Sequence, residues 1–184
     1  MFAKTMVKQS LPLFILCGLG AVFAGSTFAG MASIFQEIPG LIVVIPAIIA
    51  LRGNISTALG SRLGSAYHLG SIDAGNMWNE ELRQNIIGSL VLSFLLSLII
   101  GVLAYVTSLL LNVQPDPVKL ITIVLLAGVI SGVILTLLTV IIVYLVFRRG
   151  YDPDNITGPA LATFGDIVTM FCIFGSAVLM EVIL

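Results

Sequence analysis

The chain has 184 residues, of which 59% are hydrophobic and only 9% are charged, and its mean hydropathy is +1.17. Soluble domains carry about 25% charged residues, so this composition excludes an ordinary soluble protein and predicts an integral membrane protein. A net charge of −1 without a basic patch argues against a nucleic-acid partner. Cys17 and Cys172 both fall in apolar runs, which indicates small buried side chains and not a disulfide framework.

The first apolar run, residues 10–31, predicts a transmembrane helix. Lys4 and Lys8 precede this run and small residues lie near its end, so a cleaved signal peptide is the alternative. The apolar centre of a signal peptide is usually about 7–15 residues long. Because this run is longer and continues past the candidate cleavage site, we favour a membrane span.

The second span, residues 40–66, is not uniformly apolar. Pro46 removes a backbone donor, and Arg52-Gly-Asn54 interrupts the apolar pattern near mid-depth. Polar and small residues then recur at steps of three and four, so they share one helical face. This stripe predicts either close helix packing or the lining of a pore; its members are Asn54, Thr57, Ser61 and Gly64.

The third and fourth spans are predicted at residues 83–111 and 118–147, joined by a proline-rich turn at 114–117. The fourth span is rich in leucine, isoleucine and valine. Its Gly128 and Gly132 form a small-xxx-small pattern, which is typical of helix packing in membranes.

The fifth span, residues 156–182, contains the carboxylate around which we interpret the other spans. An ionised carboxylate at this depth is costly, so it normally faces a bundle interior or a watery cavity. Asp166 is therefore a candidate site residue. Small and hydroxyl residues share its helical face and leave room for an ion or water; they are Pro159, Ala162, Thr163 and Thr169.

Asp166 and Arg52 are both expected near the membrane midplane. Asp166 lies about eleven residues into its span and Arg52 about twelve into the second, or roughly 16 and 18 Å at 1.5 Å per residue, in a core about 30 Å thick. The two side chains can therefore form a buried ion pair. Alternatively, Asp166 faces an ion path, and Arg52 acts as a gating cation or turns to backbone carbonyls.

Five spans place the two termini on opposite sides of the membrane. The positive-inside rule predicts a cytoplasmic N-terminus and an external Leu184, with the cell membrane as the expected location. Glycosylation at the sequons of Asn54 and Asn155 is then not expected. The basic residues on the N-terminal side are Lys4, Lys8, Arg62, Arg83, Arg148 and Arg149, whereas Lys119 alone is opposite.

Two motifs resemble the MgtE-type magnesium transporters, and most closely their eukaryotic solute-carrier branch. The first is Pro46-Ala-Ile-Ile-Ala-Leu-Arg-Gly-Asn54 followed by Ala58-Leu-Gly-Ser-Arg-Leu63. The second is Asp152-Pro-Asp-Asn155 with Gly158-Pro159 and Gly165-Asp166. The resemblance covers nearly the whole chain in the order of its segments.

The resemblance implies an all-α transmembrane domain of five helices, residues 1–184, that forms a homodimer around a divalent-cation path. It also implies that Asp166 binds magnesium, helped by Ala162 and Thr163, and that the family's second-helix glycine–asparagine pair corresponds to Gly53 and Asn54. Bacterial members carry a sensor domain ahead of the first helix and no cation at the position of Arg52. The eukaryotic branch carries two such units in one chain, so a homodimer is the expected equivalent here.

The leading hypothesis is a magnesium transporter or channel whose path is formed by the second and fifth helices. Magnesium prefers oxygen ligands and sheds water reluctantly, which suits one aspartate per subunit beside Asn54, Thr57 and Thr163. Two other classes remain open. One is a membrane-embedded enzyme for lipid head groups with a metal on Asp152 and Asp154, which with Asn155 are otherwise expected at the cytoplasmic mouth. The other is a scaffold subunit without transport.

Overall fold

The computed structural model describes residues 2–72, 78–149 and 153–183. Every regular element in these ranges is a helix, which confirms the all-α fold class. The elements are α1 (Phe2–Gly30), α2 (Ala32–Glu37), α3 (Leu41–His68), α4 (Glu80–Leu110), α5 (Pro117–Arg148) and α6 (Pro153–Ile183).

The described residues contain five helices that are long and apolar enough to cross a membrane, as the sequence predicts. The candidate spans are Ser10–Gly30, Leu41–His68, Glu80–Leu110, Pro117–Arg148 and Ile156–Ile183. At 1.5 Å per residue, helices of this length exceed a hydrocarbon core of about 30 Å. Tilted helices are therefore expected.

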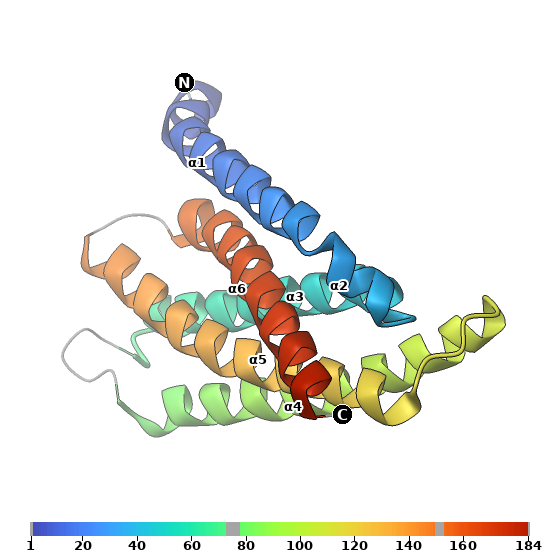
Figure 1. The fold of residues 1–184 in the computed structure, drawn as a ribbon. Coiled ribbons are helices and arrows are strands. Elements are labelled where there is room, and N and C mark those ends of the chain that lie inside the picture. Colours follow the sequence, from blue (N-terminus) through green and yellow to red (C-terminus); the bar gives the residue numbers. More distant parts are fainter. Residues whose placement is uncertain (1, 73–77, 150–152, 184) are drawn as a thin grey trace.

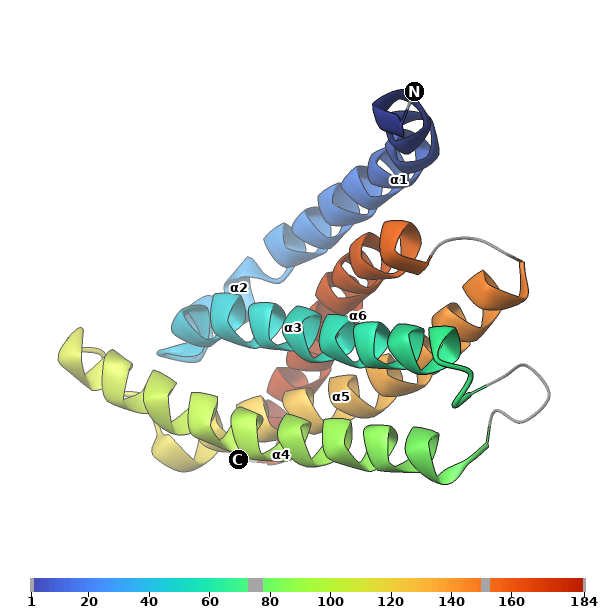
Figure 2. The same cartoon turned by 180° about the vertical axis from the view of Figure 1, so that it is seen from behind.

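Helices α3 to α6 form the body of the protein, and α1 lies outside this bundle (Figure 1). Helix α5 packs against α3, α4 and α6, and α3 also packs against α4 and α6, whereas α1 packs mainly on α6. Seen from behind, α3 and α4 lie on the near side and α1 runs away from the bundle toward its N-terminus (Figure 2). Among the α1 side chains that the structure describes, only Ala24 is buried before the helix ends. This arrangement leaves both α1 and one face of α6 accessible.

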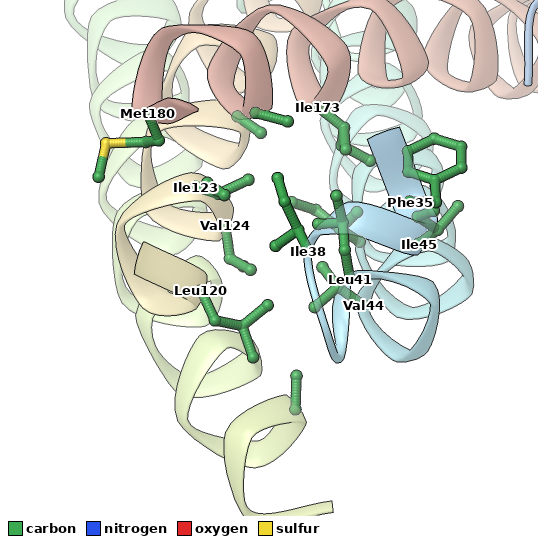
Figure 3. Packing of buried hydrophobic residues seen from close by; sticks show 14 of the residues in the cluster. Phe35, Ile38, Leu41, Val44, Ile45, Leu120, Ile123, Val124, Ile173 and Met180 are labelled. Atoms are coloured by element: carbon green, nitrogen blue, oxygen red, sulfur yellow. The ribbon is translucent and has the colours of Figure 1, made fainter. Parts of the chain in front are cut away.

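The larger apolar cluster lies where the start of α3 meets α5 and the end of α6 (Figure 3). Leu41, Val44 and Ile48 of α3 have no exposed surface, and Leu120 and Ile123 of α5 pack in the same cluster. A second cluster lies toward the other end, where α3 and α5 meet the start of α4. The two clusters hold α3 between α4, α5 and α6.

The connection between the first two spans contains a short helix that the sequence analysis did not anticipate. Helix α2 places Phe35 in the core at 4% exposure, where its ring stacks on Phe28 of α1 at a centroid distance of 5.0 Å. Gly40 then starts α3 with a φ of 84°, a backbone conformation that glycine adopts without strain. This turn fixes where α1 leaves the bundle.

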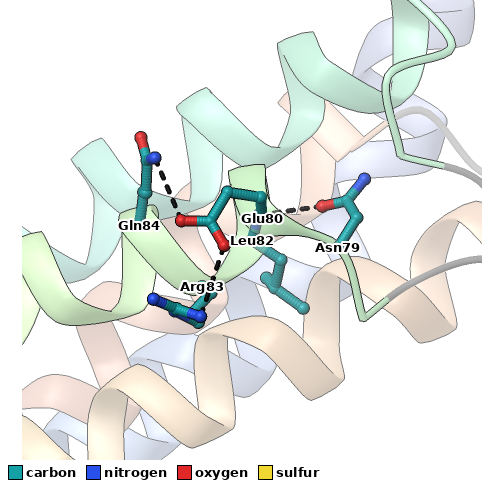
Figure 4. A network of polar contacts seen from close by, with 5 residues as sticks. All are labelled: Asn79, Glu80, Leu82, Arg83 and Gln84. Atoms are coloured by element: carbon teal, nitrogen blue, oxygen red, sulfur yellow. Dashed lines mark hydrogen bonds and ion pairs between the residues drawn. The ribbon is translucent and has the colours of Figure 1, made fainter.

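The start of α4 is held by local polar contacts (Figure 4). Asn79 accepts a hydrogen bond from the Leu82 backbone N–H at 3.0 Å and caps the helix. Glu80 forms an ion pair with Arg83 at 3.4 Å and accepts a hydrogen bond from Gln84. The side chains of Glu80, Arg83 and Gln84 are exposed at the helix end, so they stabilise the helix start and are not part of a buried site.

Helix α3 is continuous through Pro46 and through Gly53. The sequence allowed either an interruption or a polar face in this span, and the structure has the polar face. Asn54 and Ser61 are exposed and Thr57 is half-buried, whereas Gly64 is buried. Most of this polar stripe therefore lies on the surface of the protomer and is not packed against another helix of the same chain.

Candidate functional site

Helices α3 and α6 approach closely at two glycines. A methyl group added to Gly165 would lie 3.7 Å from the backbone nitrogen of Gly53 and 3.8 Å from its Cα. Further along the same crossing, Gly60 of α3 lies against Leu161 of α6. The two helices run in opposite directions, and their contact sets Gly53 and Asn54 beside the turn of α6 that carries Asp166.

Asp166 is half-buried and opens into a groove of about 310 Å³ between α1, α3 and α6. Within the described residues it has no hydrogen bond and no ion pair. Nor do these residues contain a cluster of three histidine, cysteine, aspartate or glutamate side chains that could hold a metal. Asp166 is therefore a single carboxylate without a charged or hydrogen-bonding partner among the described residues.

The groove beside Asp166 is formed by apolar residues. Pro46 belongs to its wall and has no N–H, so the carbonyl of Ile42, four residues earlier, loses its usual helical donor. Apart from Asp166, the residues around the groove have no polar side-chain atoms other than the methionine sulfur; they are Ala21, Ala24, Gly25, Phe28, Ile45, Pro46, Ile49 and Met170.

Small residues of α1 allow this helix to lie close to α6. The Cys17 Sγ donates to the Pro159 carbonyl at 3.5 Å. One turn later, a methyl group on Gly20 would come within 2.5 Å of the Thr163 methyl carbon. Helix α1 therefore covers the side of α6 that leads to Asp166.

The hydroxyl groups of Thr57 and Thr163 each donate a hydrogen bond to a backbone carbonyl of their own helix. The Thr57 Oγ1 donates to the Gly53 carbonyl at 2.8 Å, and the Thr163 Oγ1 donates to the Pro159 carbonyl at 3.1 Å. Because a hydroxyl oxygen keeps two acceptor lone pairs, each can still face a cation. Asn54 and Ala162 are exposed, so neither is used inside the chain.

Arg52 is buried at 1% exposure and turns away from Asp166. Its Nη2 donates to the Ser93 carbonyl at 3.3 Å and to the Ser97 hydroxyl at 3.2 Å, both on α4. Its Nε and Nη1 have no hydrogen-bond partner among the described residues. The ion pair that the sequence allowed is therefore not present, and the guanidinium turns instead to a backbone carbonyl.

The two glycines of α5 make room for these polar side chains. A methyl group on Gly132 would lie 2.7 Å from both the Arg52 Nη1 and the Ser93 Oγ, and one on Gly128 would overlap Ser97. The sequence analysis assigned these glycines to packing alone and missed the serines. The four-residue steps of Ser89, Ser93 and Ser97 were the available signal, because such a ladder predicts one buried polar face.

Of the expected site residues, Gly53 and Asn54 of α3 and Asp166 of α6 lie at or next to the close contact of Gly53 with Gly165. Thr169, expected on the face of Asp166, is buried with its hydroxyl unpartnered among the described residues. Asp152 lies outside the described residues, and for Asp154 and Asn155 only the helical backbone is described. The contribution of α1 to the groove beside Asp166 was not predicted from the sequence.

These features define a helical membrane protein in which Asp166, without a partner among the described residues, lies at the crossing of α3 and α6. The model of the MgtE family, described as divalent cation transporters, matches residues 45–176 and so covers α3 to α6. The chain belongs to this family. A transporter family is evidence against the lipid head-group enzyme.

The chain is also similar to curated solute carriers. It is 33% identical over 175 residues to solute carrier family 41 member 2 of Xenopus laevis and 31% identical to that of Homo sapiens, in each case over 90% of this chain. It is 29% identical to solute carrier family 41 member 3 of Rattus norvegicus, over 91% of this chain. The aligned part is 30–37% of the length of these relatives, so the chain spans about a third of them.

Proposed function

We propose that this protein moves divalent cations, magnesium first among them, across a membrane along a path formed by α3 and α6. The observation that carries the proposal is the half-buried Asp166, which has no hydrogen-bond or ion-pair partner among the described residues and follows Gly165, the residue of α6 that approaches Gly53 of α3. A carboxylate inside a membrane span is normally part of an ion or substrate pathway. The family description supports the same substrate class.

The ligand chemistry at this crossing suits magnesium. Mg²⁺ takes oxygen ligands, keeps several of its waters, and is usually held by only one or two carboxylates. Asp166 supplies the charge, while Thr57, Thr163 and Asn54 supply neutral oxygens. Gly53 and Ala162 leave space for a hydrated ion, since a methyl group on Gly53 would meet nothing within 4 Å.

The working unit in this proposal is a homodimer. Asn54 and Ser61 are exposed on a membrane-spanning helix of the single chain, and an exposed polar face is costly in lipid. A second copy placed against α3 and α6 covers this face and brings a second Asp166 to the path. Two carboxylates then balance one divalent ion.

Arg52 is the gating charge of the proposed path. Its guanidinium lies behind α3, held by Ser93 and Ser97, and has no carboxylate partner among the described residues. A fixed positive charge next to the path weakens the binding of a divalent ion at Asp166, because like charges repel more strongly in a medium of low dielectric constant. Weaker binding lets the ion leave, as conduction requires.

The basic residues orient the protein in the proposal. Arg62 lies near the end of α3, Arg83 at the start of α4 and Arg148 at the end of α5, whereas Lys119 lies at the start of α5 and so at the opposite end of the bundle. The positive-inside rule then places the N-terminus in the cytoplasm and the C-terminus outside, in the cell membrane. The cytoplasmic mouth expected at Asp152, Asp154 and Asn155 stays a prediction, because Asp152 and the side chains of Asp154 and Asn155 lie outside what the structure describes.

The test is magnesium flux into liposomes that contain only this protein, with Asp166→Asn as the variant. The amide keeps the volume and removes the charge, so we expect flux to fall to the level of empty liposomes while the protein stays folded. Asp116→Asn is the matched control, because Asp116 is an exposed cap of α5 and asparagine caps a helix equally well. Full flux in Asp166→Asn refutes the site, and no flux from the unaltered protein favours a scaffold.

A further inference from the structure

We propose that the groove beside Asp166 is a binding site for a lipophilic ammonium ion, with the positive charge on the carboxylate and the apolar body against α1 and α3. This site extends beyond the ion path and shares only Asp166 with it. The groove measures about 310 Å³, which is at the lower end of the range for small-molecule sites. A compact amine with one aromatic or branched apolar group matches this size.

The walls of the groove decide the chemical class of the ligand. A hydrated divalent ion needs oxygen atoms around it to bind the ion or its waters, and the side chains around the groove offer only those of Asp166. The other residues present carbon, plus the sulfur of Met170. A ligand that fills this space must therefore be apolar over most of its surface, and the unpartnered carboxylate selects a single positive charge.

Phe28 supplies a second feature that favours a cation. It belongs to the groove, and its ring stacks on Phe35 with an interplanar angle of 29°. Phe35 is buried in the core, so the Phe28 ring is held in place before any ligand arrives. An ammonium near an aromatic face is attracted by the negative charge of the ring face, and most strongly where water is excluded.

A substitution at a small residue of α1 can fill the groove while the carboxylate stays unchanged. Gly25 belongs to the groove, and a Cβ added there would meet nothing within 4 Å. Leucine at this position can therefore fold and extend into the space that the ligand would occupy. Gly18 is equally open but is not part of the groove, which makes Gly18→Leu a matched control on the same helix.

The experiment measures binding of N,N-dimethyl-3-phenylpropylamine to the purified full chain in detergent by calorimetry at pH 7. The neutral amide N,N-dimethyl-3-phenylpropanamide is the paired probe, because it keeps the carbon skeleton and removes the charge. We expect saturable binding of the amine with one site per chain, and binding of the amide weaker by about tenfold or more. Asp166→Asn and Gly25→Leu should each weaken the amine by a similar factor, and Gly18→Leu should not.

Equal binding of amine and amide, or amine binding unchanged in both Asp166→Asn and Gly25→Leu, overturns the site and indicates partition into the micelle. Loss in Asp166→Asn but not in Gly25→Leu also overturns it, because the carboxylate then binds amines outside the groove. The outcome is separable from the proposed transport. Failure here with Asp166-dependent flux refutes only the groove, whereas Asp166-dependent amine binding without flux refutes only the transport.

Discussion

Arg52 and Asp166 lie one residue from the same helix contact, that of Gly53 with Gly165, and their side chains point to different parts of the protein. Arg52 reaches α4, where it donates to Ser93 and Ser97. Asp166 opens into the groove between α1, α3 and α6. The two charges are therefore neighbours along the fold without being partners, and this separation makes the carboxylate available to a ligand.

Because the two charges do not pair, their substitutions should act independently. We expect the coupling energy between Arg52→Met and Asp166→Asn in a double-mutant cycle to stay well below the cost of breaking a buried ion pair. Breaking a buried ion pair instead strands one charge at a cost of about 3–5 kcal/mol. Thermal unfolding in detergent of the two single variants and the double variant measures the coupling. A coupling energy near that cost would show that the pair forms.

Added volume next to the Arg52 side chain should lower the stability of the protein. Gly132→Ala places a methyl group 2.7 Å from the Arg52 Nη1 and the Ser93 Oγ, and overpacking of this kind typically costs about 1–3 kcal/mol. Gly53→Ala is the matched control, since its methyl group meets nothing within 4 Å. We expect a lower unfolding temperature in detergent for Gly132→Ala alone. Equal unfolding temperatures for both variants contradict this close packing.

The exposed face of α3 should be the contact between two copies. After replacement of Cys17 and Cys172 by alanine, we expect a single cysteine at Asn54 or Ser61 to cross-link two chains in membranes with a short bifunctional reagent. Val91→Cys is the control, because Val91 is 50% exposed on α4, outside the proposed interface. Cross-linking at Val91 and none on α3 would assign the dimer to another face.

Labelling of single cysteines should report the orientation of the chain. With the native cysteines replaced, Glu181→Cys in α6 should react with an impermeant thiol reagent on intact cells. Arg149→Cys, at the end of α5, should react only after the membrane is opened. The reverse pattern would place the N-terminus outside and invert the proposed topology.

The sequence predicted the spans because a membrane imposes a simple requirement on composition and length. Runs of some 20 or more apolar residues separated by polar turns are sufficient to predict five helices. Helix α2 was not predicted, because its six residues, Ala32–Glu37, are too few to show a helical period of apolar residues. The family resemblance, carried by Pro46–Asn54 and by Gly165-Asp166, led to the family that the comparisons show.

The sequence by itself determined which residues share a face of each helix, because the period of 3.6 residues is a property of one helix. It thus placed Asp166 among small residues and Asn54 in a polar stripe. Only the tertiary structure decided which neighbour each face meets. In lipid, helices pack by close fit and not by hydrophobic burial, so the glycines of α5 and the small residues of α1 set that choice. The glycines of α5 leave room for Arg52 beside α4. The small residues of α1 let this helix lie close to α6 and form the groove into which Asp166 opens.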